Sequence, residues 1–425
     1  MFLCLQSLQA KTEFQRYLIA KSIHVQHDMY RKSQNLYISH AICIENRKIY
    51  TYPLTSLVSI MYSIPVYQPS LAGNEKLYVN ECLDTAWISG KGRFVSEFER
   101  QFADYIGIRN ASTVCNGTVA LHLALVALGI GPGDEVIVPT FTYIAPVNAI
   151  VYAGATPVFA DSERSSWQID PEEVRRKITS RTKAIIAVHL YGHPADMDAL
   201  SEIAKEHRIF LIEDCAEGFG TLYKNRHVGT FGDISTFSFY GNKTITTGEG
   251  GMVVTNDETL YSRTLHFKGQ GLAKYREYWH DVIGYNYRMT NICAAIGLAQ
   301  LERADELISK KIQIAKWYDE LLENTPYTTH APIGDVQHSY WMYSVLAPHV
   351  RQRDDIRAHL QKAGIETRPT FYPVHTMPMY SGKYERHPIA EDIGWRGINL
   401  PSYPDLTREQ VEYICASLID AVMHI

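Results

Sequence analysis

Three polar groups that could do chemistry stand at separate points of the sequence. Lys243 lies in "SFYGNKTITTGEGG", between an apolar run and a glycine-rich turn, and Asp214 closes the apolar run "FLIEDC" 29 residues earlier. A buried lysine is costly unless it is paired or used chemically. Upstream, Gly117 and Thr118 open the apolar helical pattern "NGTVALHLAL". Free N–H groups and the helix dipole at such a start can hold an anion.

Each group also has an ordinary explanation, because Asn-Gly-Thr is a common helix cap and a strand-end carboxylate often caps a helix or pairs with a cation. Together they match pyridoxal phosphate: an anion site for the phosphate, a carboxylate that keeps the pyridine nitrogen protonated, and a lysine that forms a Schiff base. A nucleotide P-loop is the competing interpretation of "TTGEGG", but the required Gly-Lys-Ser/Thr does not follow. The sequence therefore predicts pyridoxal phosphate as the cofactor.

The elements that must position these groups alternate between strand and helix. Runs rich in Val, Ile, Phe and Thr cover residues 135–142, 156–161, 184–192, 210–215, 233–239 and 251–256, and helical patterns cover 170–178 and 196–208. This alternation predicts an α/β fold with a mostly parallel sheet between helices, and ligands at the carboxyl ends of its strands. Glu213 and Asp214 should point to opposite faces, so one of them can meet a ligand.

Composition narrows the class of protein. The 425 residues are 46% apolar and 20% charged, with a net charge of -5, as in an ordinary globular enzyme. Dispersed lysines and arginines predict neither a nucleic-acid nor a membrane partner, and no apolar run approaches the roughly 20 residues of a membrane span. Seven scattered cysteines without a CxxC pair argue against disulfides and a zinc site, so we expect no metal and a cytoplasmic location.

Three regions are expected along the chain. Residues 1–60 mix aromatic, basic and apolar types without a period, and form an N-terminal extension that is either a partner-binding segment or a translated stretch before a natural start at Met61. We expect a large cofactor-binding domain over residues 61–310 and a small C-terminal domain over 311–425.

From about Ile64 onward the chain resembles the DegT/DnrJ/EryC1/StrS family of nucleotide-sugar aminotransferases. The similar stretches are "NGTVALHLAL", "PTFTYIAPVNAI", "GATPVFAD", "EDCAEGFG", "FSFYGNKTITTGEGGMV" and "GYNYRMTNICAAIGLAQLE". The resemblance implies fold type I of the pyridoxal-phosphate enzymes, which is aspartate aminotransferase-like, with a mostly parallel large domain and a smaller α+β C-terminal domain.

The resemblance also implies roles at single positions. Lys243 would bind the cofactor covalently and then carry a proton between cofactor and substrate, and Asp214 would pair with the pyridine nitrogen. Glu217 would lie near the phenolic oxygen, and Tyr143 would stack on the ring. A cationic, desolvated site should lower the pKa of Lys243 so that it can act as a base. Because relatives with histidine in place of this lysine are dehydratases, the retained Lys243 favours amino transfer.

The phosphate contacts implied by the resemblance are Gly117, Thr118 and Ser238, with Asn286 reaching in from a neighbouring subunit. The active protein would then be a homodimer with shared sites. Taken singly, Ser238 is also a common turn residue and Asn286 a common helix cap. Phe219 departs from the family pattern, where many relatives carry histidine, and we interpret it as a packing difference.

Within the family, "WISGKGRFVSEFE", "HFKGQGLAKYREYWHDVIGYNYRMTN" and "ETRPTFYPVH" are most similar to enzymes that act on a GDP-linked keto-sugar. This implies transfer of the amino group of L-glutamate to C4 of GDP-4-keto-6-deoxy-D-mannose, which gives GDP-perosamine for O-antigen and lipopolysaccharide synthesis. The candidate substrate contacts are Lys91, Arg93, Lys268, Arg368 and His375.

Several alternatives stay open. A lone histidine beside Pro373 is often structural, and "HSYWMYSVL" at 338–346 is expected to be a packing strand rather than a base-stacking platform. The same fold could serve a UDP- or dTDP-linked keto-sugar. A non-catalytic, cofactor-binding regulator is the alternative from another class.

Overall fold

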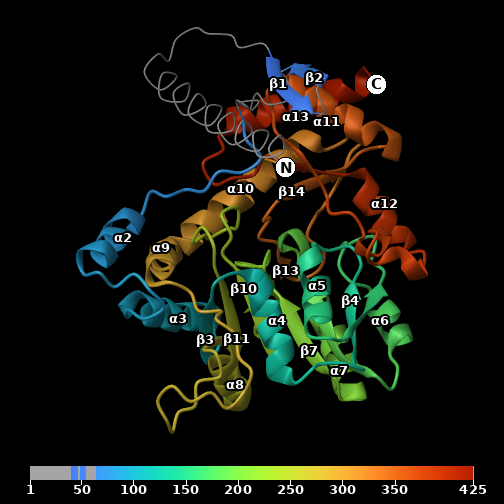
Figure 1. Ribbon diagram of the computed structural model, residues 1–425. Coiled ribbons are helices and arrows are strands. Elements are labelled where there is room, and N and C mark those ends of the chain that lie inside the picture. Colours follow the sequence, from blue (N-terminus) through green and yellow to red (C-terminus); the bar gives the residue numbers. More distant parts are fainter. Residues whose placement is uncertain (1–39, 46–47, 54–63, 425) are drawn as a thin grey trace, which may run out of the picture. The chain divides into compact units, whose positions relative to one another are not determined.

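The computed structural model describes residues 40–45, 48–53 and 64–424 (Figure 1). The chain divides into two units, Met1–Met61 and Tyr62–Ile425. In the first unit, strands β1 (His40–Glu45) and β2 (Lys48–Pro53) pair antiparallel. The rest of the predicted N-terminal extension, and the proposed start at Met61, lie outside the described residues.

The second unit is built on a seven-stranded sheet in the order β3-β11-β10-β7-β6-β4-β5 (Figure 1). Only β11 runs against the other strands. The bounds are β3 (Asn110–Val114), β4 (Glu135–Pro139), β5 (Thr156–Ala160), β6 (Thr182–Val188), β7 (Phe210–Asp214), β10 (Ile234–Ser238) and β11 (Gly251–Thr255). All six predicted strand runs are present, and the mostly parallel sheet is confirmed.

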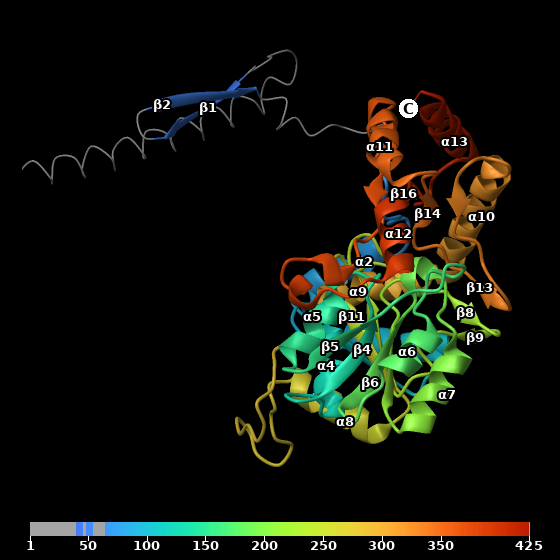
Figure 2. The ribbon, with the colours of Figure 1, turned by 90° about the vertical axis from the view of Figure 1, so that its right-hand side faces the viewer.

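Helices cover both faces of this sheet (Figure 2). Their bounds are α2 (Glu75–Asp84), α3 (Arg93–Ile106), α4 (Gly117–Leu128), α5 (Ile144–Tyr152), α6 (Pro171–Lys177), α7 (Met197–His207), α8 (Glu258–Lys268) and α9 (Asn291–Leu301). Val136 and Val138 of β4 pack in the core under α4 and α5, whereas Ile137 between them packs toward α6 and α7. The two-residue period of the strands thus feeds two separate cores.

A smaller, antiparallel sheet has the order β12-β14-β16-β15. Its strands are β12 (Thr328–Thr329), β14 (Tyr343–Leu346), β15 (Arg368–Pro369) and β16 (Gly397–Leu400), and the helices around it are α10 (Ala304–Leu322), α11 (Arg353–Lys362), α12 (Pro388–Arg396) and α13 (Arg408–Met423). The strand expected within 338–346 is β14. The expected division between residues 310 and 311 falls inside α10.

Three short strands form a further sheet in the order β13-β8-β9, with bounds β8 (Leu222–Tyr223), β9 (Arg226–His227) and β13 (Val336–Gln337). The predicted α/β class is confirmed by the whole arrangement. Within residues 40–45, 48–53 and 64–424, no helix combines the length and apolarity that a membrane crossing needs.

Candidate active site

A cavity of about 620 Å³ lies where β7, β10 and the start of α4 meet residues in and beside the smaller sheet. Its position at the carboxyl ends of parallel strands is the expected place for a ligand. The wall includes eight of the predicted site residues, namely Gly117, Thr118, Tyr143, Asp214, Glu217, Ser238, Lys243 and Arg368.

One end of the cavity is the N-terminus of α4. Asn116 caps the helix by accepting a hydrogen bond from the Val119 N–H at 3.0 Å, and the first N–H groups of any helix have no partner within it. A Cβ added at Gly117 would lie 2.7 Å from the Ser238 Cβ. Glycine therefore lets the helix start approach the end of β10 closely, which leaves a cradle of N–H and hydroxyl donors suited to a phosphate.

Lys243 follows β10 and lies between an aromatic ring and a carboxylate. Its Nζ is 3.8 Å from the Glu217 Oε1 and 3.8 Å from the centre of the Trp341 ring. Burial lowers the pKa of the Lys243 amine, against the opposing effects of Glu217 and Asp214. The lowered pKa agrees with the sequence expectation. The expectation of cationic surroundings is wrong, because the charged groups that act on the amine, Glu217 and Asp214, are both acidic.

Glu217 is buried with its two oxygens in different settings. Its Oε2 accepts a hydrogen bond from the Tyr191 N–H at 2.7 Å, and its Oε1 faces Lys243. Tyr191 has a φ of 57°, a left-handed turn that is uncommon for a bulky residue. Burial raises the pKa of the Glu217 carboxyl. The carboxyl is thus fixed at one oxygen and free to exchange a proton at the other.

β7 ends with two buried carboxylates on opposite faces, as the alternation predicts. Asp214 lines the cavity, and its Oδ1 accepts a hydrogen bond from the Ala216 N–H at 3.0 Å. Burial raises the pKa of this carboxyl, and the bond from Ala216 opposes the rise. Asp214 is the carboxylate that can meet a ligand.

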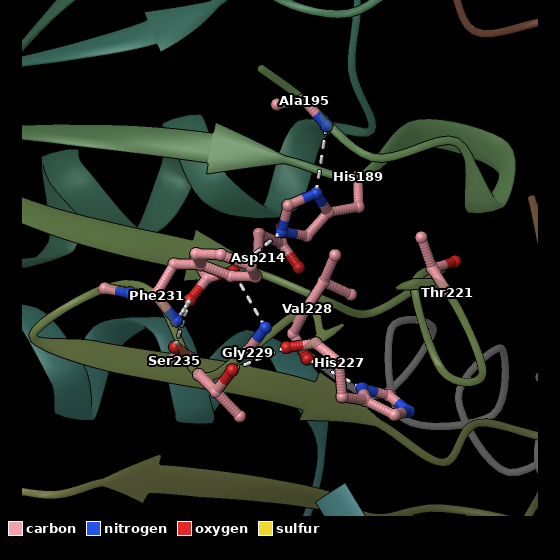
Figure 3. Close-up of polar contacts among 12 residues, drawn as sticks. His189, Ala195, Asp214, Thr221, His227, Val228, Gly229, Phe231 and Ser235 are labelled. Carbon is pink, nitrogen blue, oxygen red and sulfur yellow. Dashed lines mark hydrogen bonds and ion pairs between the residues drawn. The ribbon is translucent and has the colours of Figure 1, made fainter. Parts of the chain in front are cut away.

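Glu213, on the other face, is tied into the protein. It accepts hydrogen bonds from His189 Nε2 at 3.1 Å and from the backbone N–H groups of Gly229 and Phe231 at 2.7 Å each. Figure 3 shows His189, Gly229 and Phe231 gathered at this strand end. His189 Nδ1 accepts from the Ala195 N–H at 3.1 Å, so the histidine proton lies on Nε2. Glu213 therefore anchors the loop behind Asp214.

Glu213, His189 and Cys215 are close enough together to suggest a metal site. However, both imidazole nitrogens of His189 are used in hydrogen bonds. Glu213 also accepts from Gly232 N–H at 2.7 Å and from the Ser235 hydroxyl at 3.2 Å. We interpret this group as a hydrogen-bonded anchor.

Two predicted substrate contacts lie off the cavity wall and are held by internal bonds. The Lys268 Nζ is 3.2 Å from the Glu99 Oε1 and donates to the Thr113 carbonyl at 3.0 Å. His375 is buried, with its Nδ1 2.6 Å from the Thr140 Oγ1. Either side chain would have to give up these bonds to reach a substrate.

Three more predicted residues are exposed and also lie off the wall. Arg93 is paired with Glu81 and, at 3.1 Å, with Glu97. Lys91 is exposed, as is Asn286. In one chain these side chains do not join the other site residues, and their roles stay predictions.

Trp341 and Phe371 line the cavity but were not predicted as site residues. Trp341 lies in the stretch interpreted as a packing strand, and its contact with Lys243 links positions 98 residues apart. No spacing in the sequence signals such a contact. Phe219, the departure from the family pattern, stacks between Phe102 and Tyr105 away from the cavity, which supports its interpretation as a packing difference.

A second buried lysine lies behind the site. Lys311 of α10 is 1% exposed, and its Nζ donates to the Ser402 carbonyl and lies 5.5 Å from the centre of the Tyr67 ring. The Tyr67 hydroxyl in turn donates to the Lys243 carbonyl at 2.5 Å. Burial lowers the pKa of Lys311 to about 7. The ammonium form is thus costly in the folded protein.

We expect Lys311→Met to raise the free energy of unfolding by about 1–4 kcal/mol at pH 7 and below. Between pH 7 and the unfolded pKa near 10.4 the unfolded chain binds more protons, so wild-type stability rises with pH and the advantage of the variant shrinks. Urea unfolding at pH 6.5 and 9.5 measures this, with Lys316→Met, an exposed position of α10, as the control. A difference that does not change with pH would contradict a buried charge.

Known proteins of one family are similar to this chain over most of its length. The profile of the DegT/DnrJ/EryC1/StrS aminotransferase family matches residues 69–419. The chain is 65% identical to the GDP-perosamine synthase of Escherichia coli O157:H7, over 84% of this chain and 98% of that protein. It is 51% identical to the GDP-perosamine synthase of Vibrio cholerae, over 83% and 97% of the two chains.

Among solved structures, a putative sugar aminotransferase from Streptococcus pneumoniae in its PMP form has a TM-score of 0.82. The two chains are 29% identical, and the match covers 85% of this chain and 98% of that one. The predicted fold type, aspartate aminotransferase-like, is confirmed by this likeness.

Proposed function

Because the chain belongs to the DegT/DnrJ/EryC1/StrS family of pyridoxal-phosphate-dependent aminotransferases, we propose that it transfers the amino group of L-glutamate to C4 of GDP-4-keto-6-deoxy-D-mannose, giving GDP-perosamine. The observation that carries the proposal is the 65% identity to a GDP-perosamine synthase over nearly its whole length. The cavity supports it, because Lys243 lines it together with the carboxylates of Asp214 and Glu217.

The residues present fit the cofactor. The close approach of Gly117 to Ser238 leaves room for a phosphate at the start of α4, where Thr118 adds a hydroxyl. The Asp214 carboxylate lines the cavity and would keep the pyridine nitrogen of the cofactor protonated. The Tyr143 ring, 55% exposed on the same wall, would cover one face of the cofactor ring.

When bound, pyridoxal phosphate supplies a carbonyl that accepts and returns an amino group and a ring that stores an electron pair. Lys243 Nζ holds the cofactor and then carries the proton, because its lowered pKa makes a neutral amine accessible. Glu217 lies beside it and is buried, so it can exchange a proton with the amine away from bulk water. Asp214 stays anionic as long as it has a cationic partner.

The nucleotide sugar would extend from the cavity toward basic side chains. Arg368 lies on the wall, with its side chain 48% exposed, and suits bidentate contact with phosphate or carboxylate oxygens. Lys91 and Arg93 are proposed as further contacts from exposed positions. The choice of guanine rests on the similarity to the GDP-perosamine synthases.

We expect the protein to aminate GDP-4-keto-6-deoxy-D-mannose at least about tenfold faster, in kcat/KM, than the UDP- and dTDP-linked 4-keto-6-deoxy sugars, because a lost base contact costs roughly 1–3 kcal/mol. Mass spectrometry of the three reactions with L-glutamate measures this. A preference for a UDP or dTDP sugar would keep the aminotransferase and discard GDP-perosamine. No conversion of any sugar would favour a cofactor-binding regulator.

We further propose a homodimer in which Asn286 reaches the cofactor phosphate of the partner. Asn286 is exposed and lies off its own cavity wall. The loop before it, which projects beyond α8 in Figure 2, exposes large apolar side chains, with Tyr278 93% and Ile283 89% exposed. Apolar residues gathered on one loop are typical of a surface that another chain covers. A cytoplasmic role in O-antigen synthesis accords with the five free cysteines among the described residues.

Mixed dimers test the shared site. Lys243→Ala and Asn286→Asp should each be nearly inactive, the second because a carboxylate repels the phosphate. Equal mixing after co-expression should restore about a quarter of wild-type activity, since half of the dimers carry one native site. Mixtures that stay as inactive as their parents, with heterodimers verified by mass, would show that each site is built from one chain.

A further inference from the structure

Trp341 is held rigidly against the catalytic lysine. Its Nε1 donates to the Asn242 carbonyl at 2.7 Å, so the indole is bonded to the residue that precedes Lys243. The ring is 5% exposed and stacks on the Tyr191 ring at 6.1 Å and 5°. One side chain therefore fixes the Lys243 loop through its edge, and the face of its ring lies 3.8 Å, measured from the ring centre, from the Lys243 Nζ.

Tyr191 joins this ring to the second contact of the lysine. Its N–H holds Glu217 at 2.7 Å while its ring stacks on Trp341. Its own hydroxyl accepts from the Phe371 N–H at 2.9 Å, which orients the phenol, and burial raises the pKa of the phenol well above its usual value. The aromatic face and the carboxylate are thus aligned by one residue whose left-handed φ of 57° turns its N–H to Glu217.

We propose that Trp341 and Glu217 form a docking place for the Lys243 ammonium when its amine is not covalently bonded, and that Trp341 is a positioning residue for proton transfer. The inference rests on the proposed function, because an aminotransferase lysine is released in each half-reaction. An aromatic face attracts a cation but not a neutral amine. It therefore favours the lysine that has just taken up a proton and keeps it beside the site until the proton is returned.

Trp341 differs from the charged and titratable groups around Lys243 in how its attraction depends on pH. Glu217 and Asp214, which lie at the end of β7, are the acidic groups that act on the amine. Glu249 and Arg368 are the other charged groups on the cavity wall, and neither contributes to the shift of the Lys243 pKa. Burial opposes the ammonium form. Because Trp341 is not titratable, its attraction acts at every pH at which the lysine is charged, whereas that of Glu217 is lost when its carboxyl takes up a proton.

The test titrates Lys243 in the full chain loaded with pyridoxamine phosphate, a form in which the lysine is free. Acetylation of Lys243 is followed by mass spectrometry from pH 6 to 10 in the wild type, Trp341→Leu and Trp341→Phe. The pH midpoint is the readout, because easier access of the reagent changes the rate but not the midpoint. Trp395→Leu, at a half-exposed position outside the cavity wall, is the control.

We expect Trp341→Leu to lower the midpoint so that the neutral fraction at a given pH rises roughly fivefold to tenfold, with Trp341→Phe and Trp395→Leu close to the wild type. The pH profile of kcat should move in the same direction. An unchanged midpoint in a folded Trp341→Leu variant would overturn the proposal. Should that variant fail to fold, Glu217→Gln must lower the midpoint, and an unchanged midpoint there overturns it equally.

The outcome is separable from that of the proposed function. The titration needs no sugar substrate, so a shifted midpoint in a protein that does not aminate the GDP sugar would discard the substrate and keep the docking place. Amination of the GDP sugar with an unchanged midpoint would keep the substrate and discard the docking place.

Discussion

Lys243→Ala is expected to abolish amino transfer, with a loss of at least about 10⁴ in turnover. Among the described residues that line the cavity, Lys243 is the only lysine, so no other side chain there can take its place. The phosphate cradle at Gly117 and Ser238 lies apart from the amine and stays intact. The variant should therefore still bind the cofactor, without the visible absorbance that a covalent bond to the lysine gives.

Two companion variants make this result specific. Lys243→Arg keeps a cation in the site but cannot supply a neutral amine near neutral pH, so it should be as inactive as Lys243→Ala. Lys183→Ala changes an exposed lysine of β6 and should match the wild type. Substantial turnover by Lys243→Ala would contradict the proposed role of Lys243 as the catalytic lysine.

Asp214→Asn is expected to lower kcat by about 10²–10³-fold, the usual cost of removing one group that stabilises charge in a reaction. Asparagine still accepts the bond from the Ala216 N–H, which Asp214 accepts at 3.0 Å, so the fold should survive. It cannot keep a proton on the pyridine nitrogen, because it carries no charge. Steady-state kinetics and the unfolding temperature together separate the chemical effect from the structural one.

The neighbouring carboxylates supply the contrast for Asp214→Asn. Asp198→Asn alters an exposed carboxylate paired with Lys224 and should leave kcat unchanged. Glu213→Gln should lower the unfolding temperature instead, because Glu213 accepts several buried hydrogen bonds behind the site. If Asp214→Asn kept nearly full kcat with bound cofactor, its proposed pairing would be wrong.

Much of the fold follows from local patterns. The strands β4 to β7, β10 and β11 are short runs of β-branched and aromatic residues between turn signals, which is why their positions could be predicted. The two-residue period also placed Glu213 and Asp214 on opposite faces, as the structure has them. The combination of Asp214, Lys243 and the Gly117 helix start pointed to one cavity, and the structure brings these residues together.

What could not be predicted depends on contacts between distant segments. Trp341 lies just before β14, and its contact with Lys243 depends on how the smaller sheet packs against the large one, while its apolar surroundings resemble those of any packing strand. Lys268 lies in a family-like stretch, yet Glu99 of another helix binds its ammonium. A linear pattern cannot tell which acid folds back onto a lysine. Nor does it mark the middle of α10, whose buried positions continue on both sides of residue 311.

The most direct test follows the amino group itself. The purified protein is incubated with ¹⁵N-labelled L-glutamate and GDP-4-keto-6-deoxy-D-mannose, and the nucleotide sugar is analysed by mass spectrometry, with Lys243→Ala alongside. We expect the heavy nitrogen in a GDP-linked amino sugar, an equal amount of 2-oxoglutarate, and neither product from the variant. A GDP sugar that acquires no heavy nitrogen, while glutamate and cofactor are present, would contradict the proposed function.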